Sequence, residues 1–70
     1  MSVASVIETS ATSQTSFEDA IQQGIARATK TLRNVEGAWV KDQHVKISDG
    51  QIVAYQVNLK ITFVMEEPEA

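Results

Sequence analysis

The chain has 70 residues, no cysteine and a formal net charge of −3. This length allows one domain, the lack of cysteine excludes disulfides, and the single histidine, His44, argues against a structural zinc site. The negative charge argues against nucleic-acid binding, which needs a clustered cationic surface.

A domain of this size buries only about 60% of the surface that its unfolded chain exposes, so it is marginally stable alone. Without disulfides or zinc, self-association is the remaining way to stabilise it. The N-terminus does not resemble a signal peptide, and no stretch approaches the ~20 apolar residues of a membrane span. We therefore expect a cytoplasmic homo-oligomer.

The expected elements begin with a short strand over residues 3–8, which are rich in apolar side chains. Residues 9–15 are rich in Ser and Thr and are expected to form a loop. Apolar residues then recur at spacings of three and four over 17–35, which predicts an amphipathic helix ending near Gly37. Thr15 with Glu18, or Ser16 with Asp19, supplies a capping box at its start.

Two further strands are expected over residues 39–47 and 51–65, joined by Asp49-Gly50, a strong hairpin signal. Alternation from Val53 to Met65 predicts one face turned toward the helix. The acidic residues 66–70 are expected to be a disordered tail after a single domain of residues 1–65. The order strand, helix, strand, strand predicts an α+β fold with one helix on a three-stranded antiparallel sheet.

A two-residue loop fixes the register of the hairpin. It places Val45 opposite Ala54, Gln43 opposite Gln56 and Trp39 opposite Lys60. Trp39, Gln43, Gln56 and Lys60 would then lie on the sheet face away from the helix, together with Val45, Ile47 and Ile52. The same register turns Asp42, His44 and Lys46 toward the helix. Two explanations are open: this end of the hairpin projects beyond the helix, or a β-bulge shifts the alternation.

Chemistry typical of an enzyme is missing from the sequence. It has no Gly-rich phosphate loop and no nucleophile elbow, and His44 is the only possible base for a Ser or Thr nucleophile. No loop has calcium-binding spacing. The basic residues Arg27, Lys30 and Arg33 share the polar helix face, where they are either solvated or paired with acidic groups of a neighbouring subunit. We therefore expect a protein that is not an enzyme and holds no metal.

Several segments together resemble one known family. The run TSFEDAI from Thr15, followed by ARA from Ala26 and KTLRNV from Lys30, is similar to the helix of dodecins. The turn SDG from Ser48 and the YQV run from Tyr55 resemble the family's closing hairpin. The resemblance extends over nearly the whole chain, and its order, spacing and length carry it rather than any single motif.

The resemblance implies a β-α-β-β subunit whose sheet curls around the helix and which assembles into a hollow homododecamer with 23 symmetry. Dodecins typically bind flavins in pairs at subunit interfaces and are regarded as flavin storage or buffering proteins. A riboflavin or FMN ligand and a non-catalytic role are therefore implied for this chain.

Only some residues of the family's flavin site have a match in this sequence. A Gln that hydrogen-bonds the ring edge in the family matches Gln56, and an Asp-Gln pair of the middle strand matches Asp42 and Gln43. The Trp that stacks on the flavin is replaced by Gly37, and the only Trp, Trp39, comes two residues later. The chain therefore resembles a divergent branch that lacks the usual stacking Trp.

Two hypotheses follow for its function. In the first, the assembly binds flavin or a similar aromatic ligand, with Trp39 as the stacking platform and Gln56 at the ring edge. In the second, the assembly has lost flavin binding, Trp39 packs against a neighbouring subunit, and the protein is a structural shell or binds another ligand.

Overall fold

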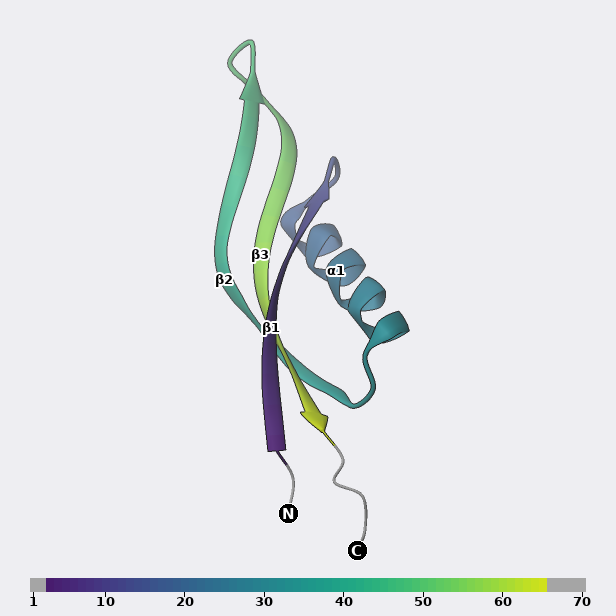
Figure 1. Cartoon of the computed structure of the whole chain (residues 1–70). Helices are drawn as coiled ribbons and strands as arrows, with labels where there is room; N and C mark the ends of the chain where they lie inside the picture. Colours follow the sequence, from purple (N-terminus) through teal and green to yellow (C-terminus); the bar gives the residue numbers. More distant parts are fainter. Residues whose placement is uncertain (1–2, 66–70) are drawn as a thin grey trace, which may run out of the picture.

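A computed structural model describes residues 3–65, which form strand β1 (Val3–Ser13), helix α1 (Phe17–Thr31), strand β2 (Val35–Ser48) and strand β3 (Gln51–Met65). The strands form one antiparallel sheet in the order β1-β3-β2, and α1 lies against one of its faces (Figure 1). The predicted β-α-β-β fold is confirmed. The expected tail, residues 66–70, lies outside the described residues.

The core lies between α1 and the central strand β3. Val57, Leu59 and Ile61 are the large side chains that are fully buried, and they alternate along one face of β3 as the sequence predicts. Small helix residues, Ala20, Gly24 and Ala28, let the helix approach this face closely. A Cβ added at Gly24 would lie 2.9 Å from Leu59 Cδ1, so a larger residue here would force the end of the Leu59 side chain to shift.

Both ends of α1 have identifiable causes. Ser16 is the N-cap, and its Oγ accepts a hydrogen bond from the Asp19 backbone N–H at 3.0 Å, as the second predicted capping pair requires. The reciprocal bond of a capping box is not made, because the Ser16 backbone N–H donates to Ser13 Oγ at 3.4 Å. At the other end Leu32 is extended and Asn34 has a φ of 59°. The predicted helix, over residues 17–35 with its end near Gly37, is therefore too long, because α1 ends at Thr31.

The predicted loop over residues 9–15 is also wrong for most of its length, because β1 continues to Ser13 and pairs with β3 as far as Tyr55. Ser and Thr side chains suit an edge strand with one exposed side. The buried Ser13 Oγ then ends the strand: it donates to Asp19 Oδ2 at 2.6 Å and accepts from the Thr15 backbone N–H at 2.9 Å.

The hairpin between β2 and β3 turns at Asp49 and Gly50, as predicted, and both have positive φ, 53° and 72°. That conformation is the one a two-residue type I′ hairpin turn requires. The hairpin extends beyond the ends of β1 and α1 as a two-stranded ribbon (Figure 1). Phe17 packs edge-on against Tyr55, with ring centroids 5.1 Å apart, where α1 begins.

The register of the hairpin departs from the prediction. Trp39 does lie opposite Lys60, but Gln43 lies opposite Val57 and Val45 opposite Tyr55. The cause is a pair of bulges, one between Val40 and Asp42 and one between Lys46 and Ile47, where single residues are unpaired.

Because of the bulges, each residue of β2 between Lys41 and the turn faces the side of the sheet opposite to the predicted one. Asp42, His44 and Lys46 lie opposite Asn58, Gln56 and Ala54, and so share the sheet face away from α1. The side chains expected there, Gln43, Val45, Ile47 and Ile52, lie instead on the helix side. Both explanations that the sequence left open are therefore realised, since the alternation is shifted and the ribbon also projects beyond the helix.

In residues 3–65, no helix is long and apolar enough to cross a membrane.

Candidate ligand site on the outer sheet face

The sheet face away from α1, called the outer face below, carries most of the predicted site residues. They come to this face through β2 and β3, whose opposed residues share a side of the sheet. The register places the following side chains or positions there: Gly37, Trp39, Asp42, His44, Gln56, Asn58, Lys60 and Thr62.

Trp39 is the most prominent apolar group of the outer face. Its side chain is 62% exposed, and it lies beside Lys60 of the central strand. A Trp offers a large flat surface that stacks on other aromatic rings with centroids ~4.5–7 Å apart. Trp39 is therefore available to a flat ligand or to a neighbouring subunit.

Gly37, two residues before Trp39, also lies on the outer face, opposite Thr62. Thr62 Oγ1 donates a hydrogen bond to the Gly37 carbonyl oxygen at 3.0 Å. A Cβ added at Gly37 would have its closest contact with Thr62 Oγ1, at 3.4 Å, which is at the edge of ordinary van der Waals contact. The subunit itself therefore leaves room for a larger side chain at this position.

A chain of polar side chains runs across β3 and β2 further along the outer face. The half-buried Gln56 donates through Nε2 to Asn58 Oδ1 at 3.4 Å, and Asn58 donates in turn to Asp42 Oδ1. These bonds leave the side-chain oxygen of Gln56, Oε1, free to accept a hydrogen bond from a ligand. Asn58 fixes the orientation of both neighbours.

This polar chain borders a shallow depression of about 500 Å³, lined by Asp42, Gln43, His44, Gln56 and Asn58. Three predicted site residues, Asp42, Gln43 and Gln56, therefore meet here, although Gln43 belongs by its register to the helix side. Asn58 was not predicted, although its place two residues after Gln56 on an alternating strand indicates the same face. The predicted register turned His44 toward the helix, which is wrong, because the bulges move it to the outer face.

The bulge after Val40 also positions a charged group. Lys41 is the unpaired residue, and its Nζ forms an ion pair with Glu8 Oε1 of β1 at 2.9 Å. The hydrogen bond from Lys41, and next its charge, lower the pKa of the Glu8 carboxyl, while the same hydrogen bond raises the pKa of Lys41. Both side chains are about half exposed, so the pair orders the surface more than it stabilises the fold.

Trp39 and the depression are separate features within one subunit. Their partners on β3, Lys60 and Gln56, are four residues apart, which corresponds to about 13 Å along a strand. The structure therefore brings Asp42, Gln43 and Gln56 together but leaves Trp39 and Gly37 apart from them. In residues 3–65, no three His, Cys, Asp or Glu residues are grouped so as to hold a metal ion.

Known proteins share this arrangement of helix and curled sheet. Residues 3–66 match the family model described as Dodecin. The chain belongs to the dodecin family. The dodecin of Thermus thermophilus is 39% identical over 61 residues, which cover 87% of this chain and 88% of that protein. A solved dodecin structure from Streptomyces coelicolor has a TM-score of 0.89, with 33% identity over 96% of each chain.

The similarity extends to a dodecin that is named for a metal ion. The calcium dodecin of Mycobacterium tuberculosis is 31% identical over 65 residues, covering 93% of this chain and 92% of that protein. Its crystal structure, described as having a novel calcium-binding site, has a TM-score of 0.79 and 29% identity, with 97% of each chain covered. A dodecin this similar in sequence is therefore named for calcium.

Proposed function

We propose that the protein is a non-catalytic, flavin-binding homododecamer that stores or buffers riboflavin or FMN in the cytoplasm. Membership of the dodecin family supports a small shell protein. The observation that carries the ligand proposal is the exposed Trp39 on the same sheet face as Gln56. Residues 1–65 form the proposed domain.

Self-assembly is supported by the balance of buried and exposed apolar groups. Only Val57, Leu59 and Ile61 are fully buried large side chains, whereas the exposed large apolar side chains outnumber them. The exposed set comprises Val3, Val6, Ile7, Trp39, Val40, Ile47, Ile52, Val53 and Met65. Contact between subunits would remove these apolar groups from water and so add to the small core of the single subunit.

The proposed flavin site divides two tasks between two subunits. The flat indole of Trp39 stacks on the ring system and supplies most of the affinity. The carbonyl oxygen of Gln56 accepts a hydrogen bond from the polar ring edge and fixes orientation. Because these groups lie about 13 Å apart along one sheet, the site combines Trp39 of one subunit with Gln56 of another.

A second candidate function is an assembly without flavin, and Gly37 favours it. This position lies on the outer face and is open to a larger side chain, yet it lacks the stacking Trp that the family resemblance implies there. Trp39 would then pack against a neighbouring subunit. The relative named calcium dodecin shows that other ligands occur among similar chains.

A titration of flavin fluorescence distinguishes the two functions. Ligand-free protein is added to riboflavin and, separately, to FMN, and the mass of the assembly is measured on the same samples. Quenching that saturates at a fixed ratio of subunits to flavin supports the flavin shell. An assembled protein that leaves micromolar flavin unquenched would favour the second candidate, and a monomer would contradict both.

A further inference from the structure

The projecting end of the β2–β3 hairpin is an exposed apolar surface without a partner in its own subunit. Ile47 and Ile52 lie opposite one another and Val53 is the bulged residue beside them. Ile47 is 64% exposed, and about half of the surface of each of the other two is exposed. We call these three residues, together with Asp49 of the turn, the hairpin tip.

A two-stranded ribbon is at best marginally stable in water without a surface to pack on. On β3, the ribbon beyond β1 extends from Tyr55, the partner of Ser13, back to Gln51, the residue that follows the turn. This distance corresponds to about 13 Å. A surface of comparable length would cover the tip.

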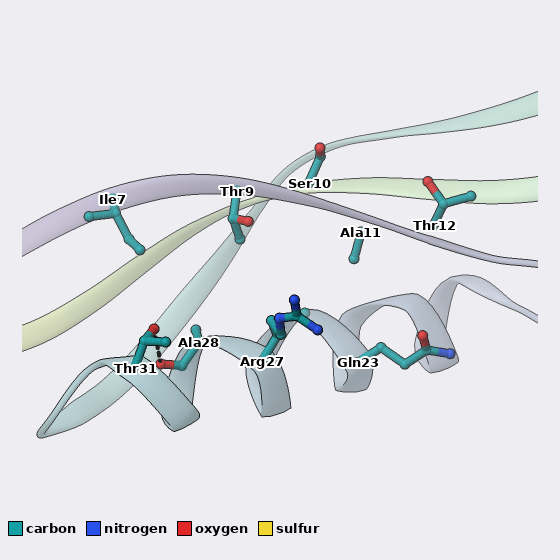
Figure 2. Close-up of a pocket in the computed structure, with 10 residues that line it drawn as sticks. Ile7, Thr9, Ser10, Ala11, Thr12, Gln23, Arg27, Ala28 and Thr31 are labelled. Atoms are coloured by element: carbon teal, nitrogen blue, oxygen red, sulfur yellow. Dashed lines mark hydrogen bonds between the residues drawn. The ribbon is translucent and has the colours of Figure 1, made fainter.

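A groove of suitable length runs between α1 and the edge strand β1. It has a volume of about 400 Å³ and mixes apolar and polar groups, including Ile7, Thr9, Ala11, Arg27 and Thr31. Along β1 the lining extends from Ile7 to Thr12, about 17 Å. Figure 2 shows Arg27 on the helix, reaching toward β1 across this groove.

The charges of the lining residues favour this groove, and not the depression of the outer face, as the surface that contacts the hairpin tip. Arg27 is the charged residue of the groove lining, and the described residues contain no ion pair for it. Asp49 is likewise exposed and unpaired among the described residues, at the end of the ribbon. The outer-face depression is lined by Asp42, which would repel Asp49.

We propose that the hairpin tip of one subunit docks into the α1–β1 groove of a second copy, with Asp49 of the tip against Arg27 of the groove. This inference rests on the proposed self-assembly and names the contact that produces it. The two surfaces are different parts of the chain, so the contact is heterologous and closes into a ring when the rotation between copies allows. It places Ile47 and Ile52 against Ile7 and Ala11.

The test is a double-mutant cycle on the assembly of the full chain, because residues in contact have non-additive effects. Asp49→Asn removes the charge and keeps a favourable type I′ turn, since Asn-Gly suits that geometry. Arg27→Gln removes the partner charge. Each change should raise the concentration for half-assembly, measured by sedimentation, at least threefold. The concentration for half-assembly of the double variant should be no higher than that of the more affected single variant.

Lys30→Gln is the matched control, because Lys30 is exposed on the same helix but does not line the groove. Its effect should simply add to that of Asp49→Asn. An additive result for Arg27 and Asp49 in an assembly that otherwise forms would overturn the docking while leaving the flavin shell intact. A wild-type protein that stays monomeric would overturn both.

A cysteine variant tests the competing arrangement in which two tips meet. The chain has no cysteine, so Ile47→Cys introduces a unique thiol. Docking into the groove keeps these thiols apart, and the assembled variant should remain reduced under mild oxidation. Formation of a covalent dimer within the assembly would show that two tips are in contact, since a disulfide needs Cβ atoms ~3.5–4.5 Å apart.

Discussion

Replacing Trp39 with alanine separates the two roles that its indole can have. If it stacks on flavin, its loss removes a contact worth about 1–3 kcal/mol, by analogy with bases stacked on aromatic side chains. The dissociation constant for FMN should then rise about 5–150-fold. Trp39→Phe, which retains a smaller ring, should give an intermediate value, and the mass of the assembly should not change in either variant.

The alternative role gives a different magnitude. Taking about 250 Å² for a whole Trp, the 62% that is exposed in the subunit corresponds to about 150 Å². Burying it between subunits contributes about 4 kcal/mol at ~25 cal/mol per Å². Trp39→Ala would then dissociate the assembly at low protein concentration. An unchanged FMN affinity together with a weakened assembly, followed by fluorescence titration and sedimentation, would refute Trp39 as the flavin platform.

Three other changes test separate parts of the structure. Gly37→Trp should lower the FMN dissociation constant at least tenfold, because the subunit leaves the position open. An FMN affinity equal to that of the wild type in the titration would show that a neighbouring subunit fills the space. Gly24→Ala should lower the free energy of unfolding by up to about 2 kcal/mol in chemical unfolding. Crowding against Leu59 costs about 1–3 kcal/mol, and the higher helix propensity of alanine offsets about 1 kcal/mol of it. A gain in stability would mean that Leu59 moves freely. The lowered pKa of Glu8 means that its pairing with Lys41 stabilises the folded state above the ordinary glutamate pKa of 4.5 and is lost as the pH falls through the lowered value. Melting temperatures of Glu8→Gln should therefore fall less with acidification than those of the wild type, and parallel curves would contradict this assignment.

Local signals in the sequence were sufficient for much of the fold. The alternation from Tyr55 onward, the Asp49-Gly50 turn and the Ser16 cap each depend on residues close together in the chain, and each is confirmed. Val53 departs from the predicted alternation, because a bulge leaves it unpaired. The end of α1 was misjudged because Val35 continues the helical spacing of apolar residues. Val35 does pack against the core, but from an extended strand, and spacing alone does not distinguish these two conformations.

The site was harder to predict because it depends on register. The pairing of Trp39 with Lys60 was correct, and Gln56 was correctly placed on the outer face. Gln43 was misplaced because two bulges intervene between the turn and Trp39, and their effects on pairing cancel only beyond the second. A bulge arises from packing and twist across strands, and no residue type near Lys41 marks its position.

The bulge at Lys41 also changes what an insertion or a deletion would do to this protein. Before it, odd-numbered positions of β2, Gly37 and Trp39, share the outer face; after it, even-numbered positions, Asp42 and His44, do so. Deleting Lys41 would join Val40 directly to Asp42, whose partners Leu59 and Asn58 are already consecutive, so both halves of the strand would keep their faces and only the bulge would be lost. The bulge therefore allows this strand to lose one residue, and with it the Lys41–Glu8 ion pair, while the remaining side chains keep their places on the outer face.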